Sequence, residues 1–309
     1  MTVVCWALAA PGLLWAAVRL FGLERGPLVQ LLAFTPYVAG WSLVPLALAL
    51  ALRRWGPASV AAVAAIALIG VVVPRAVGGS DGTNGPALRV LTANLLAGAA
   101  DIPALVAIVR ERAVDVLAVQ EFTPDAAAEL DRHGLAELMP HRCLNPIVGT
   151  EGSGLYSRHP LTDTGVRHNE GGFTQAYGTV RVPGGAHPVV ESVHPAAPYS
   201  LAMLGLWRTD LAGQSKATPD GPLRILAGDF NATLDHAPLR DLLASGYRDA
   251  ADAAGAGLTG TWGPYDGDRI PPVTIDHVLV DRRIGVREVR VYPVPGSDHR
   301  AVLAELTLP

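Results

Sequence analysis

Three long apolar stretches occupy the first 77 residues, and they limit what this chain can fold into more than any other feature. Residues 3–21, 28–52 and 58–77 are each close to the roughly 20 residues that a helix needs to cross a bilayer. The alternative is a cleaved signal peptide followed by a buried pair of helices, but none of the three stretches has a polar face. We therefore expect residues 1–77 to form three transmembrane helices.

The charges between these stretches predict an orientation. Arg53 and Arg54 lie between the second and third stretches without an acidic neighbour, whereas Glu24 accompanies Arg25 between the first and second. The positive-inside rule places the paired arginines in the cytoplasm. The N-terminus is then inside, and everything after the third stretch is extracytoplasmic.

Residues 78–87 (GGSDGTNGPA) have the composition of a linker. Ten residues reach only about 35 Å when fully extended, so the following domain, residues 88–309, is expected to stay close to the membrane surface. The first 80 residues contain five arginines and one glutamate, which leaves 19 basic and 27 acidic residues, a formal charge of −8, for the rest. Cys5 and Cys143 are the only cysteines, and we expect no disulfide within the chain.

Strand-like runs dominate the pattern beyond the linker, with a few helical segments between them. Residues 102–112 have helical spacing, with Asp101 as the N-cap before Pro103, and residues 200–212 form a second predicted helix. Strands that follow one another in this way favour an α/β sandwich of two sheets over a doubly wound parallel sheet. The predicted strands are 88–93, 114–119, 154–157, 178–182, 189–193, 223–227, 275–280, 286–291 and 301–306.

Polar residues follow several of these runs at the point where each run ends. Asn94 closes LTAN, Glu121 follows VQ, and Asp229 and Asn231 close AGDFN. Carboxylates, amides and imidazoles in this combination suit a Mg²⁺-type ion together with a phosphate group. The candidate site residues are Asn94, Glu121, His194, Asp229, Asn231, Asp276, Asp298 and His299.

Several of these residues also have a simpler structural interpretation. Glu121 is a candidate ligand because an unpaired buried carboxylate is costly, but it is equally a candidate capping acid. Asp229 and Asn231 would face the same side of an extended segment, whereas G-D-x-N sequences also favour an Asx-turn. A lone histidine such as His194 is more often structural, and Asp298 follows a proline–glycine turn where an ordinary turn aspartate would fit.

His299 pairs naturally with Asp276. A carboxylate on one ring nitrogen fixes the tautomer and supports a charged imidazole beside a phosphate. His277 adjoins Asp276, so its side chain should point to the opposite face of the same strand, and we leave it out of the site.

No motif identifies the loops that would select a substrate. Residues 171–173 and 262–268 are candidate rims, with Trp262 and Tyr265 as apolar contacts. Ordinary loop packing is the preferred interpretation of both segments.

A family resemblance covers about residues 88–309. It rests on Asn94, Glu121, His194-Pro195, GDFN at 228–231, IDHVLV at 275–280 and SDH at 297–299. These motifs resemble the endonuclease/exonuclease/phosphatase superfamily, which implies a DNase I-like sandwich of two sheets. Three spans followed by such a domain resemble the VanJ-type membrane proteins of actinomycetes, which are associated with teicoplanin resistance.

The resemblance also implies a role for each site residue. Glu121 would be the principal ligand of Mg²⁺, which Mn²⁺ can replace at oxygen ligands, and Asp298 would assist. Asp229 would orient or deprotonate the attacking water. Asn94 would position the metal-site carboxylates or the phosphate. Asn231 and His194 would donate hydrogen bonds to phosphoryl oxygens, and Asp276 would orient His299.

The expected function is metal-dependent hydrolysis of a phosphate at the outer membrane face. A lipid-linked pyrophosphate such as undecaprenyl pyrophosphate is the preferred substrate, with a role in recycling the cell-wall carrier and in teicoplanin resistance. An extracytoplasmic nuclease and a phospholipid phosphodiesterase are alternatives, but the charge of −8 and the single lysine, Lys216, disfavour nucleic acid. A catalytically inactive sensor of a phospholipid or glycopeptide is a third class, which the full set of catalytic residue types disfavours.

Overall fold

The computed structural model describes residues 1–79, 85–263 and 269–309 of the chain. Its first helix, α1 (Thr2–Phe21), is continuous although Pro11 lies within it. Helix α5 (Trp55–Val72) runs on into the short 3-10 helix η1 (Val73–Ala76). These are the two helices among the described residues that are long and apolar enough to cross a membrane, judged by length and composition.

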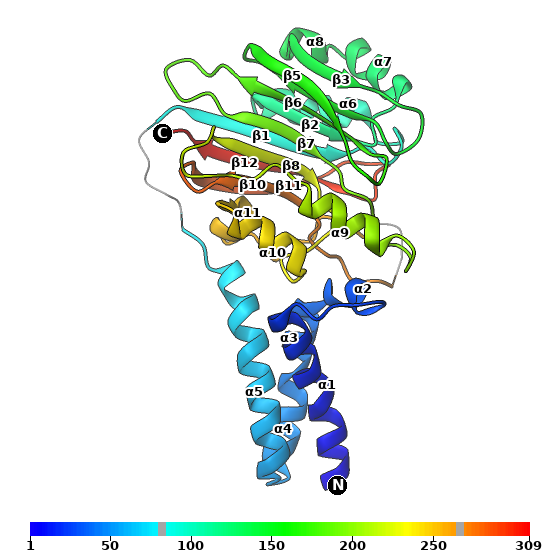
Figure 1. The fold of residues 1–309 in the computed structure, drawn as a ribbon, viewed down its shortest axis with the longest axis vertical. Coiled ribbons are helices and arrows are strands. Elements are labelled where there is room, and N and C mark those ends of the chain that lie inside the picture. Colours follow the sequence, from blue (N-terminus) through cyan, green and yellow to red (C-terminus); the bar gives the residue numbers. More distant parts are fainter. Residues whose placement is uncertain (80–84, 264–268) are drawn as a thin grey trace.

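Residues 28–52, which were expected to form one spanning helix, do not form a single continuous helix. The stretch is divided into α2 (Leu28–Leu32), α3 (Thr35–Trp41) and α4 (Leu43–Ala51). Pro36 stands in the first turn of α3, where its missing N–H costs no helical hydrogen bond, and the chain bends between α2 and α3. Thr35–Ala51 remains as a shorter apolar helix, and it packs beside α1 and α5 in one bundle (Figure 1).

The rest of the described chain forms two stacked six-stranded sheets, which confirms the predicted sandwich (Figure 1). The first sheet runs in the order β11 (Gly285–Pro293), β12 (Arg300–Thr307), β1 (Ala87–Asn94), β2 (Val116–Gln120), β4 (Ser153–Ser157) and β3 (His141–Asn145). The second runs in the order β5 (Leu161–His168), β6 (Thr174–Val180), β7 (Val189–Val193), β8 (Arg224–Asp229), β10 (Asp276–Asp281) and β9 (Tyr247–Asp249).

Apolar side chains fill the space between the sheets, and helices cover their outer faces. Val90, Ala118 and Val278 belong to the buried cluster that joins the two sheets. The first sheet is covered by α6 (Ile102–Glu111), α7 (Pro124–Arg132) and α8 (Leu135–Leu138), and the second by α9 (Leu204–Ala212) and α10 (Ala237–Ala244). The predicted cap of α6 is confirmed, because Asp101 accepts a hydrogen bond from the amide of Ala104.

The strand directions bring the candidate site residues to one edge of the sandwich. β1 and β2 are parallel, as are β7 and β8, so the C-terminal ends of each pair lie together. β12 runs antiparallel to β1, and β10 runs antiparallel to β8, so their N-terminal ends reach the same edge. Asp276 pairs directly with Asp229 in the register of β10 and β8.

The two-sheet domain packs directly on the apolar helices and is not held by the linker alone. Asp235 is fully buried and forms ion pairs with Arg19 at 3.0 Å and with Arg75 at 2.6 Å. The Gly79 amide donates to the carbonyl of Ala253 in α11 (Ala250–Ala253) at 3.1 Å. Residues 80–84 of the predicted linker lie outside the described residues.

Candidate active site

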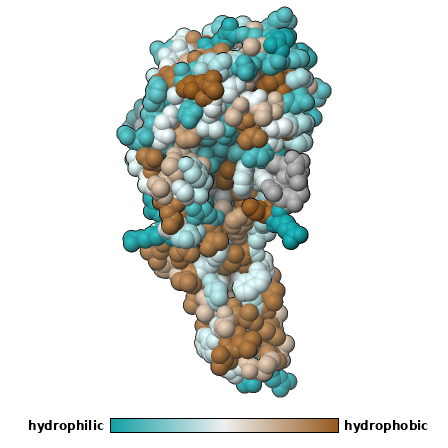
Figure 2. All heavy atoms as spheres, turned by 90° about the vertical axis from the view of Figure 1, so that its right-hand side faces the viewer, coloured by the Kyte–Doolittle hydropathy of each residue, from teal (hydrophilic) through white to brown (hydrophobic). Residues whose placement is uncertain are grey.

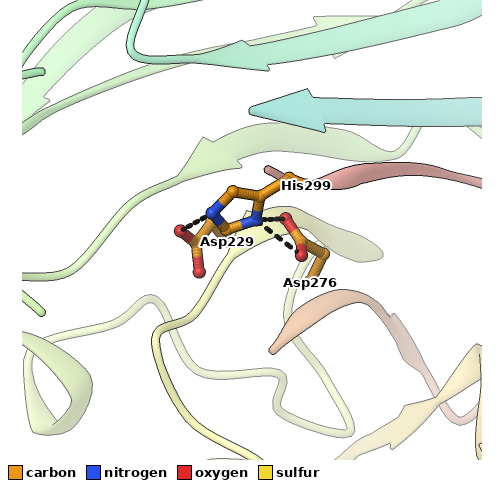
Figure 3. Close-up of side chains that lie close together, drawn as sticks. All are labelled: Asp229, Asp276 and His299. Atoms are coloured by element: carbon orange, nitrogen blue, oxygen red, sulfur yellow. Dashed lines mark hydrogen bonds and ion pairs between the residues drawn. The ribbon is translucent and has the colours of Figure 1, made fainter. Parts of the chain in front are cut away.

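His299 and Asp276 form a buried dyad (Figure 3). Nδ1 of His299 lies 3.0 and 2.9 Å from the two carboxylate oxygens of Asp276. Burial alone would lower the pKa of His299, but the charges of Asp276 and Asp229 together raise it to about 10. The ring is therefore an imidazolium at neutral pH, with Nε2 left to face the site.

Asp229 lies at the centre of the polar cluster. One of its oxygens, Oδ2, is 3.6 Å from Nε2 of His299 and 3.7 Å from Nε2 of His194. The same oxygen accepts a hydrogen bond of 3.1 Å from the side-chain amide of Asn94. Burial raises the pKa of Asp229, and the positive charge of His299 opposes that shift. A carboxylate in these surroundings can accept a proton from a water molecule.

The Asx-turn interpretation of residues 229–231 is correct for the backbone. The Asn231 amide N–H donates to Oδ1 of Asp229 at 2.8 Å, and Asn231 has a left-handed φ of 49°. The extended geometry that would align the two side chains is therefore absent here. Both side chains nevertheless line one cavity, because the turn redirects the chain at the end of β8. Nδ2 of Asn231 donates to the carbonyl of Pro195 at 3.1 Å.

Glu121 is held by its neighbours at the end of β2. Its carboxylate accepts one hydrogen bond from Asn94 Nδ2 at 3.1 Å and one from the Ala97 amide at 2.7 Å. Burial raises the pKa of Glu121 in spite of these two donors. Asn94 therefore bridges the carboxylates of Glu121 and Asp229. Glu121 also has a left-handed φ of 52°, a conformation that is costly outside glycine and is concentrated at functional sites.

Asp298 has one oxygen available for a ligand. Its Oδ2 accepts a hydrogen bond from Nε1 of Trp262 at 3.0 Å. Its Oδ1 is buried and has no hydrogen-bond partner among the described residues, with Nε2 of His299 at 3.9 Å. An orphaned carboxylate oxygen in the same cavity as the half-buried Glu121 fits a hard divalent cation.

A second grouping of metal-ligand atoms differs from the predicted pair. Oxygen and nitrogen atoms of Asp229, Asp276 and His299 lie within 4.8 Å of one another and form a possible acidic and histidine metal site. The 2.9 Å hydrogen bond between His299 and Asp276 already occupies Nδ1 of the ring. We therefore interpret this group as a charge-paired dyad and keep Glu121 and Asp298 as the expected ligands.

His194 differs from His299 in its charge. It follows β7, is buried against Phe173 with ring centroids 4.6 Å apart, and has no hydrogen-bond partner for Nδ1 within the described chain. Burial lowers the pKa of His194 to about 4, although Asp229 acts in the opposite direction. At neutral pH it is an uncharged imidazole with one N–H to donate.

His277 points away from the site, as predicted. Its Nδ1 lies 2.8 Å from Oδ2 of Asp249, and its Nε2 lies 2.9 Å from the carbonyl of Ala232. Burial opposes a charge on the ring, but Asp249 raises the pKa of His277. These contacts make His277 part of the support beneath β10.

A cavity of about 530 Å³ lies in front of the polar cluster. Six of the eight predicted residues line it, while Asn94 and Asp276 stand behind them. Phe173 and Trp262, from the two candidate rims, also line it, and Tyr265 lies outside the described residues. Sequence reasoning missed one wall completely, because that wall comes from the apolar module and consists of Val29, Gln30, Ala33 and Phe34.

Comparisons with known proteins agree with this architecture. The model of the endonuclease/exonuclease/phosphatase family matches residues 91–299. No curated protein matches the chain.

Solved structures give the same fold at low identity. An endonuclease/exonuclease/phosphatase from Beutenbergia cavernae is 21% identical over 72% of each chain, with a TM-score of 0.58. A mannosyl-6-phosphatase from Bacteroides thetaiotaomicron is 17% identical, with a TM-score of 0.53 over 72% of this chain and 100% of its own. TDP2 from D. rerio, solved with a single-strand DNA product, is 16% identical, with a TM-score of 0.55 over 72% and 99%.

Proposed function

This chain belongs to the endonuclease/exonuclease/phosphatase family, and from that membership we propose that it is a metal-dependent phosphohydrolase acting on a lipid-linked pyrophosphate. The observation that carries the proposal is the composition of the cavity. The candidate catalytic residues and the apolar side chains of Val29, Ala33 and Phe34, which come from the apolar module, line one space. An amphiphile with a phosphate head matches both halves of that space.

The residues divide the chemistry among them. Glu121 and Asp298 would hold Mg²⁺ or Mn²⁺, which neutralises phosphate charge when bound. Asp229 orients a water molecule and accepts its proton, because burial raises the pKa of its carboxyl group. The charged His299 and the neutral His194 donate to oxygens on which negative charge develops.

Two further residues complete the site. Asp276 holds His299 in its protonated form and fixes its orientation through the Nδ1 contact. An asparagine amide has two N–H groups, and one of those on Asn231 is used by the Pro195 carbonyl. The second N–H is then available for a phosphoryl oxygen.

The proposed substrate is undecaprenyl pyrophosphate or a close relative. Its hydrolysis to the monophosphate would recycle the cell-wall carrier, and the resemblance to VanJ-type proteins implies a link to teicoplanin resistance. The proposed location is the cell membrane, with several spans and an extracytoplasmic catalytic domain. The formal charge of −8 over residues 81–309 disfavours a nucleic acid partner, since binding to DNA depends on cationic contacts with phosphates.

Phosphate release from purified full-length protein in detergent tests the proposal. Undecaprenyl pyrophosphate with Mg²⁺ should yield one inorganic phosphate per lipid, and EDTA should stop the reaction. Asp229→Ala protein prepared in parallel serves as the inactive control. Cleavage of single-stranded DNA or a phospholipid without release from the pyrophosphate would replace the proposal with a nuclease or a phosphodiesterase. Binding of a lipid without any turnover would favour a sensor.

A further inference from the structure

The short helix α2 and the two residues that follow it form one wall of the active-site cavity. Val29, Gln30, Ala33 and Phe34 line the same space as Asp229 and His299. They lie at the start of the second apolar stretch, nearly 200 residues away from Asp229 in the chain. In Figure 2, apolar residues on the face shown continue from the helices to the base of the domain.

Specific hydrogen bonds hold this wall against the domain. Nε2 of Gln30 donates to the carbonyl of Pro198 at 2.7 Å, across the cavity mouth. Nε2 of His236 lies 2.8 Å from the carbonyl of Val29, and the Ala237 amide donates to Oε1 of Glu24 at 2.7 Å. These contacts fix the distance between α2 and the catalytic groups, so the wall belongs to the folded site.

The cavity mouth carries apolar side chains that face solvent. Tyr199 is 76% exposed and Ile270 is 48% exposed, and both line the cavity. Exposed apolar groups that border a cavity mark a surface that binds an apolar partner. Here they stand beside helices that are apolar enough to lie in a bilayer, so the available apolar partner is a lipid chain.

We propose that residues 29–34 and the facing segment 197–199 form a subsite for the hydrocarbon chain of the substrate, next to its phosphate. This inference rests on the proposed function and adds to it that the apolar module selects the substrate as well as anchoring the domain. The chain of a lipid-linked pyrophosphate runs past Phe34 and Ala33 towards the bilayer. A soluble phosphate compound has no group to place there.

Two substrates and three variants separate chain recognition from catalysis. The substrates are undecaprenyl pyrophosphate in mixed micelles and isopentenyl pyrophosphate, which has five carbons and is soluble in water. Phe34→Ala removes part of the wall, and Ala33→Trp fills the space beside the wall in which the hydrocarbon chain would lie. Leu31→Ala is the matched control, because Leu31 lies two residues before Ala33, is 45% exposed and is not among the cavity-lining residues.

The expected result is a selective loss. Phe34→Ala and Ala33→Trp should lower kcat/KM for the long-chain substrate by about tenfold, the scale for losing apolar contacts in a binding pocket, and leave the short-chain value unchanged. Leu31→Ala should change neither value. An equal loss for both substrates, or no loss for either, would overturn the subsite while leaving the proposed function intact.

A second measurement does not depend on turnover. Undecaprenyl monophosphate that carries a photoreactive diazirine in its first isoprene unit should crosslink to residues 28–34, as mapped by mass spectrometry. The same probe should label Ala33→Trp protein less. Crosslinking confined to other segments would refute the subsite, whether or not the protein hydrolyses either pyrophosphate. A lack of hydrolysis of both pyrophosphates would refute the proposed function.

Discussion

Replacing Asp235 should separate the stability of the docked structure from its chemistry. Its carboxylate has no exposed surface and accepts hydrogen bonds from Arg75 at 2.8 and 2.6 Å and from Arg19 at 3.0 Å. The Arg75 side chain is 6% exposed and that of Arg19 is 12% exposed. Asp235→Ala therefore leaves two nearly buried guanidinium groups without their carboxylate.

The expected cost is large because charges are left buried without a partner. Removing one member of a buried ion pair costs about 3–5 kcal/mol, which corresponds to a fall in melting temperature of roughly 6–20 °C for a domain of this size. Thermal unfolding in detergent measures this shift. Asp241→Ala, an exposed aspartate on the neighbouring helix α10, is the matched control and should melt within a degree or two of the parent.

The same residue gives the loss a pH signature. Burial would raise the pKa of Asp235, but hydrogen bonds and charges from Arg75 and Arg19 hold it below its usual value. The carboxylate therefore contributes its full stabilisation at pH values above its pKa in the unfolded chain, about 3.9. This stabilisation is lost as the pH falls through the lower pKa of Asp235 in the folded protein. The gap in melting temperature between the parent protein and Asp235→Ala should be full at pH 7 and should narrow below pH 4. A gap that is absent at pH 7, or constant down to acid pH, would refute this reasoning.

Two further predictions concern catalysis and topology. Asp229→Ala or His299→Ala should lower phosphate release by at least about 10²-fold without a loss of folding, whereas His277→Ala should act mainly by lowering the melting temperature, because its ring is paired with a buried aspartate. Near-normal turnover by Asp229→Ala would remove its assigned role. A reporter that is active only after export should be active when fused after Pro309 and silent when fused at Arg54, and the opposite pattern would reverse the orientation.

The buried strands could be predicted from the sequence because their apolar runs are continuous. Val189–Val193 forms β7 with the predicted bounds, since most of its side chains face packed layers. β5 (Leu161–His168) was missed because it is an edge strand whose side chains are largely half-buried or exposed, so no apolar periodicity marks it. Helix α7 was also not predicted, although Thr123 as its N-cap and Pro124 at its first position are typical of a helix start.

The meeting of the polar residues could be predicted from the sequence, but the backbone conformation at two of them could not. Strand ends predict that Asn94, Glu121 and Asp229 meet, and the hydrogen bonds of Asn94 join the other two. The left-handed conformations of Glu121 and Asn231 depend on turns that the surrounding packing enforces. Both residue types have other preferred conformations, so their sequence neighbourhood alone does not specify these angles.

The docking of the domain depends on contacts that no local pattern records. Asp235 meets Arg75 across 160 positions and Arg19 across 216 positions of the chain. No local sequence pattern pairs these two arginines with Asp235, and residues 28–34 look like the start of a span. Once Asp235 neutralises the arginines, the apolar helices and the strand edge are fixed face to face, and α2 is placed beside Asp229 and His299. Asp235 is followed directly by His236 and Ala237, which bond to Val29 and Glu24, so weakening the ion pairs of Asp235 should also loosen the apolar wall of the cavity.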